Sequence, residues 1–318
     1  MAVLPRSSGS ECCHACRVLE RDLKNSIRDR VEEEPMTSRL QWEVFVSAQI
    51  PVVTNDLPPG ASEMKWSPIS STLIFGKRDA VLVDTAITID QNQKIVDWIA
   101  DSGKNLTAIY ATHGHGDHFF GVNTIQKKFA KARFVATQEV ITVMRKQASV
   151  PVVDSYWKPR FPGQIDSALV VADELKGGIL ELEGEQLVSV PLGHTDTDST
   201  TCLHVPSIGL AVCGDAVYND VHLHLGESNA QGRKEWLAAL GTIESLKPVA
   251  VIAGHKRAGA PDTPNNIEET RKYIRDFDRI AANTGTALEL YKEMLAIYPE
   301  RVNPAVLWYS AQAVKSGT

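Results

Sequence analysis

The segment "ATHGHGDHFFG", residues 111–121, places three histidines and an aspartate within six positions. Imidazole nitrogens and carboxylate oxygens are ligands that divalent zinc accepts in proteins. The glycines at 114 and 116 let the backbone fold tightly, so alternating side chains can face different metal ions. The segment therefore predicts a metal site, with the candidate ligands His113, His115, Asp117 and His118.

Three further candidates stand in the same local setting, directly after an apolar β run. His194 follows "QLVSVPLG", Asp215 follows "IGLAVCG" and His255 follows "VAVIAG", as the first cluster follows "LTAIYAT". If these strands point the same way, their carboxyl ends meet at one edge of a sheet. Seven such ligands in one place predict two metal ions.

The elements that would position these residues alternate between β and α patterns. We expect a layered α/β protein with one catalytic body and a helical end. The expected strands lie at 40–49, 71–75, 80–85, 106–112, 133–137, 178–184, 185–192, 200–206, 208–214 and 249–254, with a hairpin at 76–79. The expected helices lie at 89–103, from 119, from 138, at 233–246 and from 264 onward.

Two segments fall outside this alternation. The stretch 151–166 carries three prolines with Tyr156, Trp157 and Phe161, so we expect a loop that supplies an aromatic pocket together with the C-terminal helices. Residues 1–35 are expected to be an extension, mobile or a short helix ended by Pro35. The catalytic domain is then 36–263, and 264–318 is a helical segment packed on it.

Composition limits the partners of this chain. The net charge of −6 argues against a sequence-independent hold on nucleic acid. No apolar run approaches the roughly 18 residues of a membrane span, and the start lacks the apolar core of a signal peptide. We therefore expect a small-molecule substrate, no nucleic-acid or membrane partner and a cytoplasmic location; the oligomeric state is not indicated.

The five cysteines are expected to be free thiols, because their number is odd and their spacing does not suit a disulfide framework. Three of them crowd into "CCHAC", residues 12–16, too closely for the paired ligands of a structural zinc site.

The motif "HGHGDH" with the later His194, Asp215 and His255 resembles the metallo-β-lactamase superfamily, whose signature is HxHxDH followed by separate His, Asp and His. The resemblance covers residues 40–260 in the order of elements and implies an αββα sandwich with a dinuclear site at one edge. It implies two zinc ions per chain, the first bound by His113, His115 and His194 and the second by Asp117, His118 and His255, with Asp215 as the bridge.

Two details accompany the resemblance. Asp84, at the end of "AVLVD", matches a position where such proteins carry a carboxylate that orients a ligand histidine, although it also suits a strand-end cap. After "GHT" many members have a glycine two positions on, whereas this chain reads "GHTDTDST". The loop Thr195–Ser199 therefore departs from the family pattern.

Two zinc ions about 3.5–4 Å apart lower the pKa of a shared water to about 7 and polarise a carbonyl oxygen. We therefore expect a hydrolase that opens a lactam or lactone, a small cyclic amide or ester, with a metal-bound hydroxide. Asp117 would orient this nucleophile or accept its proton. An amide nitrogen needs a proton as it leaves, and the candidate donors are Tyr218, His222 and His224.

Other functions remain open. A thioesterase similar to glyoxalase II would use the same seven ligands and also has a helical C-terminal region. A phosphodiesterase or nuclease of the superfamily shares HxHxDH, but no basic module is evident here. A non-catalytic zinc-binding protein is disfavoured because no ligand is missing. An oxygen-reducing diiron enzyme is disfavoured because it carries a glutamate in place of His115. His204, within a strand, and His14 are not expected to bind metal.

Overall fold

The computed structural model describes Met1 and residues 40–316 of the chain. The described residues from 40 onward belong to one compact unit. The extension predicted for residues 1–35, with its "CCHAC" cluster, lies outside the described residues.

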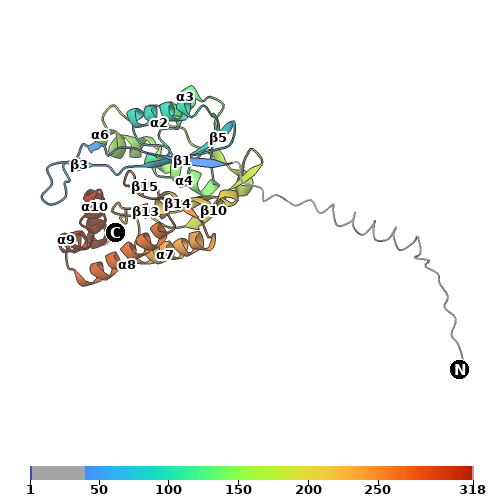
Figure 1. Ribbon diagram of the computed structural model, residues 1–318. Helices are drawn as coiled ribbons and strands as arrows, with labels where there is room; N and C mark the ends of the chain where they lie inside the picture. Colours follow the sequence, from blue (N-terminus) through green and yellow to red (C-terminus); the bar gives the residue numbers. More distant parts are fainter. Residues whose placement is uncertain (2–39, 317–318) are drawn as a thin grey trace. The chain divides into compact units, whose positions relative to one another are not determined.

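Two sheets stack between layers of helices (Figure 1). The strand order is β1-β4-β5-β6-β7-β8 in the first sheet and β14-β12-β11-β10-β9 in the second. The first sheet consists of β1 (Gln41–Val46), β4 (Ser70–Phe75), β5 (Asp79–Val83), β6 (Asn105–Tyr110), β7 (Arg133–Ala136) and β8 (Asp173–Glu174). The second consists of β9 (Ile179–Leu182), β10 (Glu185–Gly193), β11 (Thr200–Val205), β12 (Leu210–Val212) and β14 (Ala250–Ile252). Two short pairs join β2 (Pro51–Val52) with β3 (Met64–Lys65) and β13 (Tyr218–Asn219) with β15 (His255–Lys256).

The helices cover the outer faces of the two sheets. The first sheet is covered by α2 (Ile89–Asp101), α3 (Val122–Lys128) and α4 (Gln138–Gln147). On the second sheet, α7 (Ala230–Ser245) packs on β10, α8 (Asn265–Asn283) packs on α7, and α9 (Ala287–Ile297) and α10 (Pro304–Ser316) extend this helical layer. This order of layers is the αββα sandwich with a helical C-terminal segment, so the predicted fold class is confirmed.

Three apolar cores separate these layers, and β5 shows how the sequence builds them. Ala80 and Leu82 belong to the core beneath the helices, whereas Val81 and Val83 belong to the core between the sheets. Because successive side chains of a strand point to opposite faces, a strand covered on both faces is a continuous apolar run. The second sheet has the third core, which it shares with α7 to α10.

The segment 151–166 differs from the predicted loop, because most of it is helical. It contains α5 (Val150–Val152), a wide π-helical turn (Val153–Trp157) and α6 (Lys158–Arg160). Its prolines at 151 and 159 lie at the starts of helical pieces, where a missing backbone N–H costs little. Burial of Trp157 and Phe161 in the core of the first sheet stabilises this conformation, so these two rings do not line an open pocket.

A smaller difference concerns α3, which begins at Val122 instead of 119. Residues Gly116–His118 form a 3-10 turn first, and the carbonyl of Gly116 accepts hydrogen bonds from the backbone N–H of both Phe119 and Phe120. Burial of these two phenylalanines in the core ends the turn before the helix starts.

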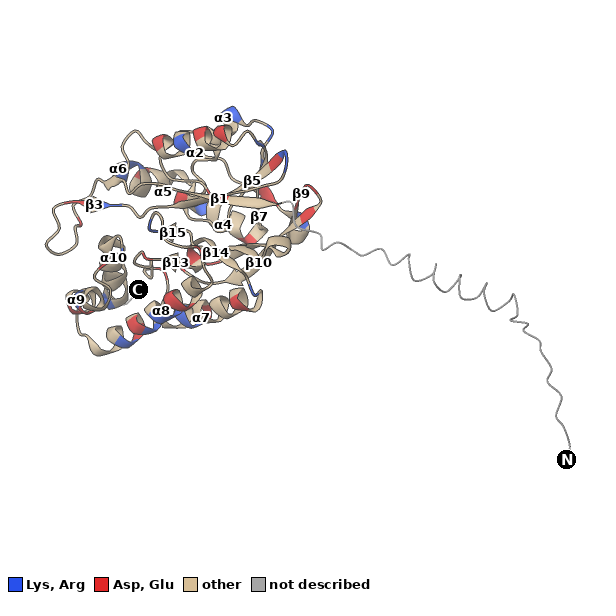
Figure 2. Ribbon diagram, viewed as in Figure 1, with Lys and Arg blue, Asp and Glu red and all other residues tan. Residues whose placement is uncertain are grey.

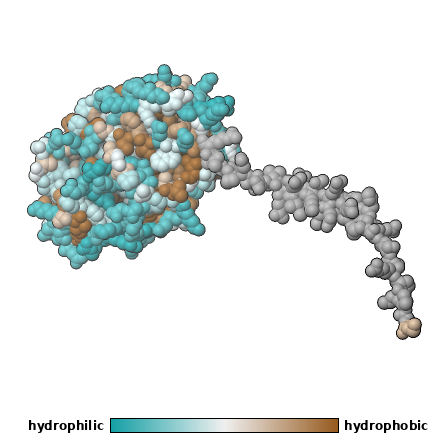
Figure 3. All heavy atoms as spheres, in the orientation of Figure 1, coloured by the Kyte–Doolittle hydropathy of each residue, from teal (hydrophilic) through white to brown (hydrophobic). Residues whose placement is uncertain are grey.

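Charged residues recur along α2, α3, α7 and α8 (Figure 2). The lower border of the face in Figure 3 is correspondingly hydrophilic where Figure 1 places α7 and α8. Within residues 40–316, no helix is both long enough and apolar enough to cross a bilayer.

Candidate metal centre

Four strands deliver polar segments to one edge of the sandwich. In the second sheet, β12 is parallel to β14, and β10 points the same way because both β10 and β12 pair antiparallel with β11. The end of β6 in the first sheet joins them there, since the backbone N–H of Thr201 donates to the carbonyl of Thr112 at 2.9 Å. The predicted meeting point is therefore an edge shared by both sheets.

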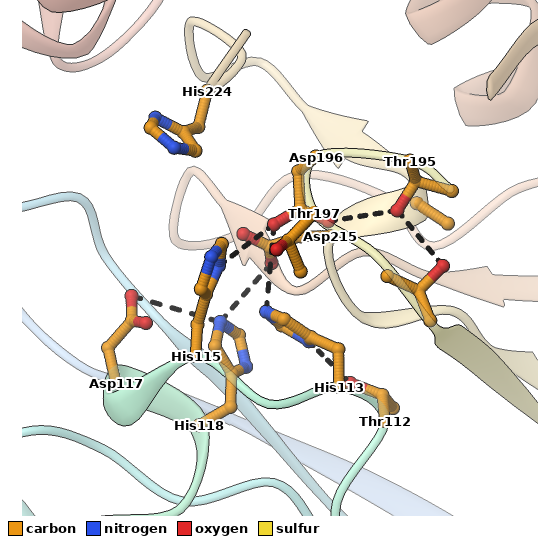
Figure 4. A network of polar contacts seen from close by, with 12 residues as sticks. Thr112, His113, His115, Asp117, His118, Thr195, Asp196, Thr197, Asp215 and His224 are labelled. Carbon is orange, nitrogen blue, oxygen red and sulfur yellow. Dashed lines mark hydrogen bonds and ion pairs between the residues drawn. The ribbon is translucent and has the colours of Figure 1, made fainter. Parts of the chain in front are cut away.

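The first group of potential ligands is buried. Ligand-type atoms of His113, His115, Asp196 and Asp215 all lie within 4.8 Å of one another. The Oδ2 atom of Asp196 is 2.9 Å from Nδ1 of His115 and 3.8 Å from Nε2 of His113. Figure 4 shows the imidazole rings pointing toward these carboxylates.

The second group consists of Asp117, His118 and His255, and Asp215 connects it to the first. Oδ2 of Asp117 lies 3.5 Å from Nε2 of His255 and 3.8 Å from Nε2 of His118. The two oxygens of Asp215 lie 3.2 Å from Nε2 of His118 and 3.1 Å from Nε2 of His255. Asp215 thus lies between the groups, where the family pattern expects the bridge.

The residues present fit divalent metal ions. Buried atoms at the centre of the two groups have no hydrogen bond of acceptable geometry, although they lie at ion-pair distances from one another. Unpartnered buried polar atoms are costly unless a metal or another partner satisfies them. These atoms are Nε2 of His113, His115 and His118, Oδ2 of Asp196 and Oδ1 of Asp215.

The electrostatics of the centre also favour a cation. Burial lowers the pKa of His255, but the carboxylates of Asp215 and Asp117 outweigh it and raise this pKa to about 10. Burial would raise the pKa of Asp215, but His255 and His118 hold it well below its usual range. The carboxylates thus retain positive charge on the neighbouring imidazoles, and a divalent ion is a natural replacement for those protons.

Asp84 holds the segment from behind. Its Oδ1 accepts the backbone N–H of Thr112 at 2.8 Å, and its Oδ2 accepts the Thr112 hydroxyl at 2.7 Å and lies 3.1 Å from Nδ1 of His118. The carboxylate therefore makes both expected contacts, with a strand end and with a candidate ligand histidine. It does so from a left-handed backbone, with φ of 59°, a conformation that persists where surrounding contacts enforce it.

Trp66, which the sequence did not indicate, supports Asp117. Its indole N–H donates to Oδ2 of Asp117 at 3.0 Å. The Trp66 ring packs on Trp157 and Phe161, with ring centroids 5.5 Å and 5.6 Å away. The aromatic residues of segment 151–166 thus help to position a candidate ligand through Trp66.

The three candidate proton donors lie in different places. The Tyr218 hydroxyl donates to Oδ2 of Asp215 at 2.9 Å. His222 is fully buried with Nδ1 at 2.8 Å from the Tyr273 hydroxyl, in the core under α8. The His224 ring makes an edge-to-face contact with the ring of His115, with centroids 5.8 Å apart (Figure 4). Of the three, only His224 stands at the rim with part of its side chain exposed.

His194 is placed apart from the other predicted ligands. Its Nδ1 lies 2.6 Å from Oδ1 of Asp198 and its Nε2 lies 2.8 Å from Oγ of Ser228. It belongs to none of the potential ligand groups found among residues 40–316, and its role as a ligand stays a prediction. His204, expected not to be a ligand, lies in β11 and outside these groups as well.

Two residues of the site were not predicted from the sequence. Asp196 belongs to the first group of potential ligands, and Oε1 of Glu227 lies 3.3 Å from Nε2 of His115. The only signal for Asp196 was the departure of "GHTDTDST" from the family pattern. Glu227 lies in an unpatterned loop before α7 and gave no signal.

A two-layer β core between helices, with clustered histidines and aspartates at one edge, defines a metal-binding αββα sandwich. Residues 64–255 match the metallo-beta-lactamase superfamily. The chain belongs to this superfamily, whose members are metal-dependent hydrolases.

Individual relatives are distant. The chain is 22% identical to the metallo-beta-lactamase type 2 of Bacteroides fragilis over 213 residues, 66% of this chain and 76% of the relative. It is 25% identical to the hydroxyacylglutathione hydrolase of Chromohalobacter salexigens over 196 residues, 57% of this chain and 64% of that protein. A solved metallo-beta-lactamase family protein from Thermus thermophilus superposes with a TM-score of 0.56 at 19% identity, over 85% of this chain and 91% of the other.

Proposed function

We propose that this protein is a dizinc hydrolase that opens a small cyclic amide or ester, a lactam or lactone. The observation that carries the proposal is the pair of buried ligand groups, His113 and His115 on one side and Asp117, His118 and His255 on the other, with Asp215 between them. Zinc ions bound there would supply an activated water and polarise the carbonyl of the substrate.

The residues of the chain handle the water and its proton. Asp117 is buried, and the N–H of Trp66 fixes its Oδ2, so its carboxylate is oriented to hold a water and accept a proton from it. The surrounding rings of His113 and His118 are fully buried, which excludes bulk water from the floor of the site. Substrate would approach from the side of His224, which is part-exposed.

His224 is the residue we assign to the leaving group. Its ring stacks on Tyr309 with centroids 5.5 Å apart, and its Nε2 lies 3.9 Å from Oε1 of Glu227. These contacts orient an imidazole toward the centre, where it would donate a proton to a departing amide nitrogen. Tyr218, whose hydroxyl is bonded to Asp215, is instead assigned to positioning.

A thioester is the second candidate substrate. It is favoured by the similarity to a hydroxyacylglutathione hydrolase, a protein named for a thioester substrate. The similarity to a metallo-beta-lactamase supports the first candidate in the same way. The two differ in what the leaving group needs, since a thiolate leaves without a proton and an amide nitrogen does not.

The test is a hydrolysis screen of zinc-loaded protein against lactones, lactams, thioesters and phosphodiesters, with elemental analysis of the same samples. We expect about two zinc ions per chain, loss of turnover after chelation and recovery on adding zinc. Undiminished turnover by the metal-free protein would refute the proposal.

A pair of variants then separates the two substrate classes. His224→Phe preserves the stack on Tyr309 and removes the proton, so lactam turnover should fall by at least about 100-fold while thioester turnover stays within a few-fold. His204→Phe, on β11, is the matched control and should leave both unchanged. Equal losses on both substrates would remove His224 from the role of donor.

A further inference from the structure

The carboxylate of Asp196 points into the metal centre from the loop that follows β10. The side chain is fully buried, and Oδ1 accepts a hydrogen bond from the Thr195 hydroxyl at 2.9 Å. The other oxygen, Oδ2, faces His115 and His113 and makes no hydrogen bond of acceptable geometry. Its contacts are ion-pair distances to these two imidazoles, 2.9 Å and 3.8 Å, and a buried carboxylate beside imidazoles is a donor set that a divalent cation accepts.

His194, two residues earlier, is held on the outside of the same loop. Both of its ring nitrogens are engaged, by Asp198 at 2.6 Å and by Ser228 at 2.8 Å. The ring rests against the start of α7 at Gly232, where a Cβ atom would lie 2.5 Å from Nε2 of His194. The absence of a side chain at position 232 therefore makes room for this outward ring.

Two further contacts fasten the loop in this arrangement. The Ser228 hydroxyl donates to the backbone carbonyl of Thr195, and the Thr197 hydroxyl donates to Oε2 of Glu227 at 2.8 Å. Turning His194 into the centre would break its contacts with Asp198 and Ser228.

From these contacts we infer that Asp196, and not His194, completes the first metal site together with His113, His115 and Asp215. His194 is then a positioning residue that holds the loop. The inference rests on the proposed metal-dependent function and changes its ligand set. The first metal would be bound by two imidazoles and two carboxylates, in place of three imidazoles and one carboxylate. The set with two carboxylates is the harder one and carries one more negative charge.

The test compares zinc binding by Asp196→Asn, Asp196→Ala and His194→Ala. Each variant is loaded with zinc, desalted and analysed for metal content, and zinc affinity is measured by competition with a chelator. Both Asp196 variants should retain one zinc ion, with first-site affinity reduced more than about 100-fold, beyond the 10- to 100-fold effect of residues that only orient a ligand. His194→Ala should retain both ions, with affinity reduced at most about 10-fold.

Cobalt substitution gives a second measurement that does not depend on the Asp196 variants. Ring N–H protons of metal-bound imidazoles are paramagnetically shifted, and their number should be the same in the wild-type protein and in His194→Ala. Circular dichroism and thermal melting of the metal-free proteins show whether each variant is folded.

Loss of one zinc ion, or of one shifted N–H signal, in His194→Ala would overturn the inference. Two tightly bound ions in Asp196→Ala would also overturn it. A wild-type protein that binds no zinc contradicts the proposed function itself, whereas a dizinc hydrolase in which Asp196→Ala keeps both ions contradicts only the ligand assignment.

Discussion

Replacing Tyr218 by phenylalanine removes one hydroxyl from a buried position directly beneath the metal centre. The Tyr218 side chain is 1% exposed, and its hydroxyl donates to Oδ2 of Asp215 at 2.9 Å. Burial, followed by the charge of Asp215, raises the pKa of Tyr218 well above its usual value, so it stays a protonated donor at neutral pH. The variant keeps the ring and loses only this bond.

The expected magnitude follows from the charge of the acceptor. A hydrogen bond to a charged group contributes about 1.5–3 kcal/mol, which corresponds to about 10- to 150-fold in an equilibrium constant. The 10- to 100-fold effect typical of residues that orient a metal ligand agrees with this range. We expect Tyr218→Phe to weaken zinc binding by about 10- to 100-fold and, under saturating zinc, to retain turnover within a few-fold.

The assay measures zinc affinity by chelator competition and turnover at saturating zinc for the same preparation. Tyr273→Phe is the control, because its buried hydroxyl lies 2.8 Å from Nδ1 of His222, in a core away from the metal ligands. It should lower the free energy of unfolding by about 1 kcal/mol and leave zinc affinity unchanged. Turnover of Tyr218→Phe that stays more than 100-fold low at saturating zinc would instead make this tyrosine the proton donor.

Three other perturbations have defined outcomes. Asp117→Asn should lower turnover by more than about 100-fold and weaken one zinc site. Its control, His204→Ala, should leave the zinc content unchanged. Near-normal turnover of Asp117→Asn at saturating metal would contradict the role of Asp117. Asp84→Asn tolerates the left-handed backbone but removes the charge beside a ligand histidine, so a zinc titration should show one site weakened by about 10- to 100-fold. Burial, and then Arg301, lowers the pKa of His222 to about 3. The unfolded chain takes up this proton near pH 6.5, so stability is complete above that pH and falls as the pH drops toward 3, by up to about 1.4 kcal/mol per pH unit. His222→Gln should flatten this slope in urea unfolding of the metal-free protein, and a slope equal to that of the wild type would show that His222 does not titrate in this way.

The local features of the fold could be predicted from the amino-acid sequence. Apolar patterns located the strands of both sheets except β8, whose two residues are Asp173 and Glu174. The run at 80–83 already had the continuous apolar character of a strand buried on both faces. The spacing of "HGHGDH" predicted which side chains lie close together. Six consecutive residues stay near one another, and the two glycines allow the tight turn between them. Asp215 and His255 could be placed because each follows a strand, and the two strands, β12 and β14, are parallel and therefore end at the same edge of the sheet.

Which side of a loop faces the metal centre depends on contacts that form only in the folded protein. The pattern could not choose between His194 and Asp196, because the outcome depends on Ser228 and Gly232, more than 30 residues further along the chain. Segment 151–166 is helical because the core of the first sheet buries its aromatic residues. The free energy of this burial cannot be inferred from the prolines within the segment. His222 and His224 are two residues apart, so in an extended segment their side chains would lie on the same face. In the fold, packing under α8 buries His222, whereas His224 lies at the rim of the site. Local periodicity is set by bonded geometry, whereas the direction of a side chain in a loop is set by contacts with segments that are distant in sequence.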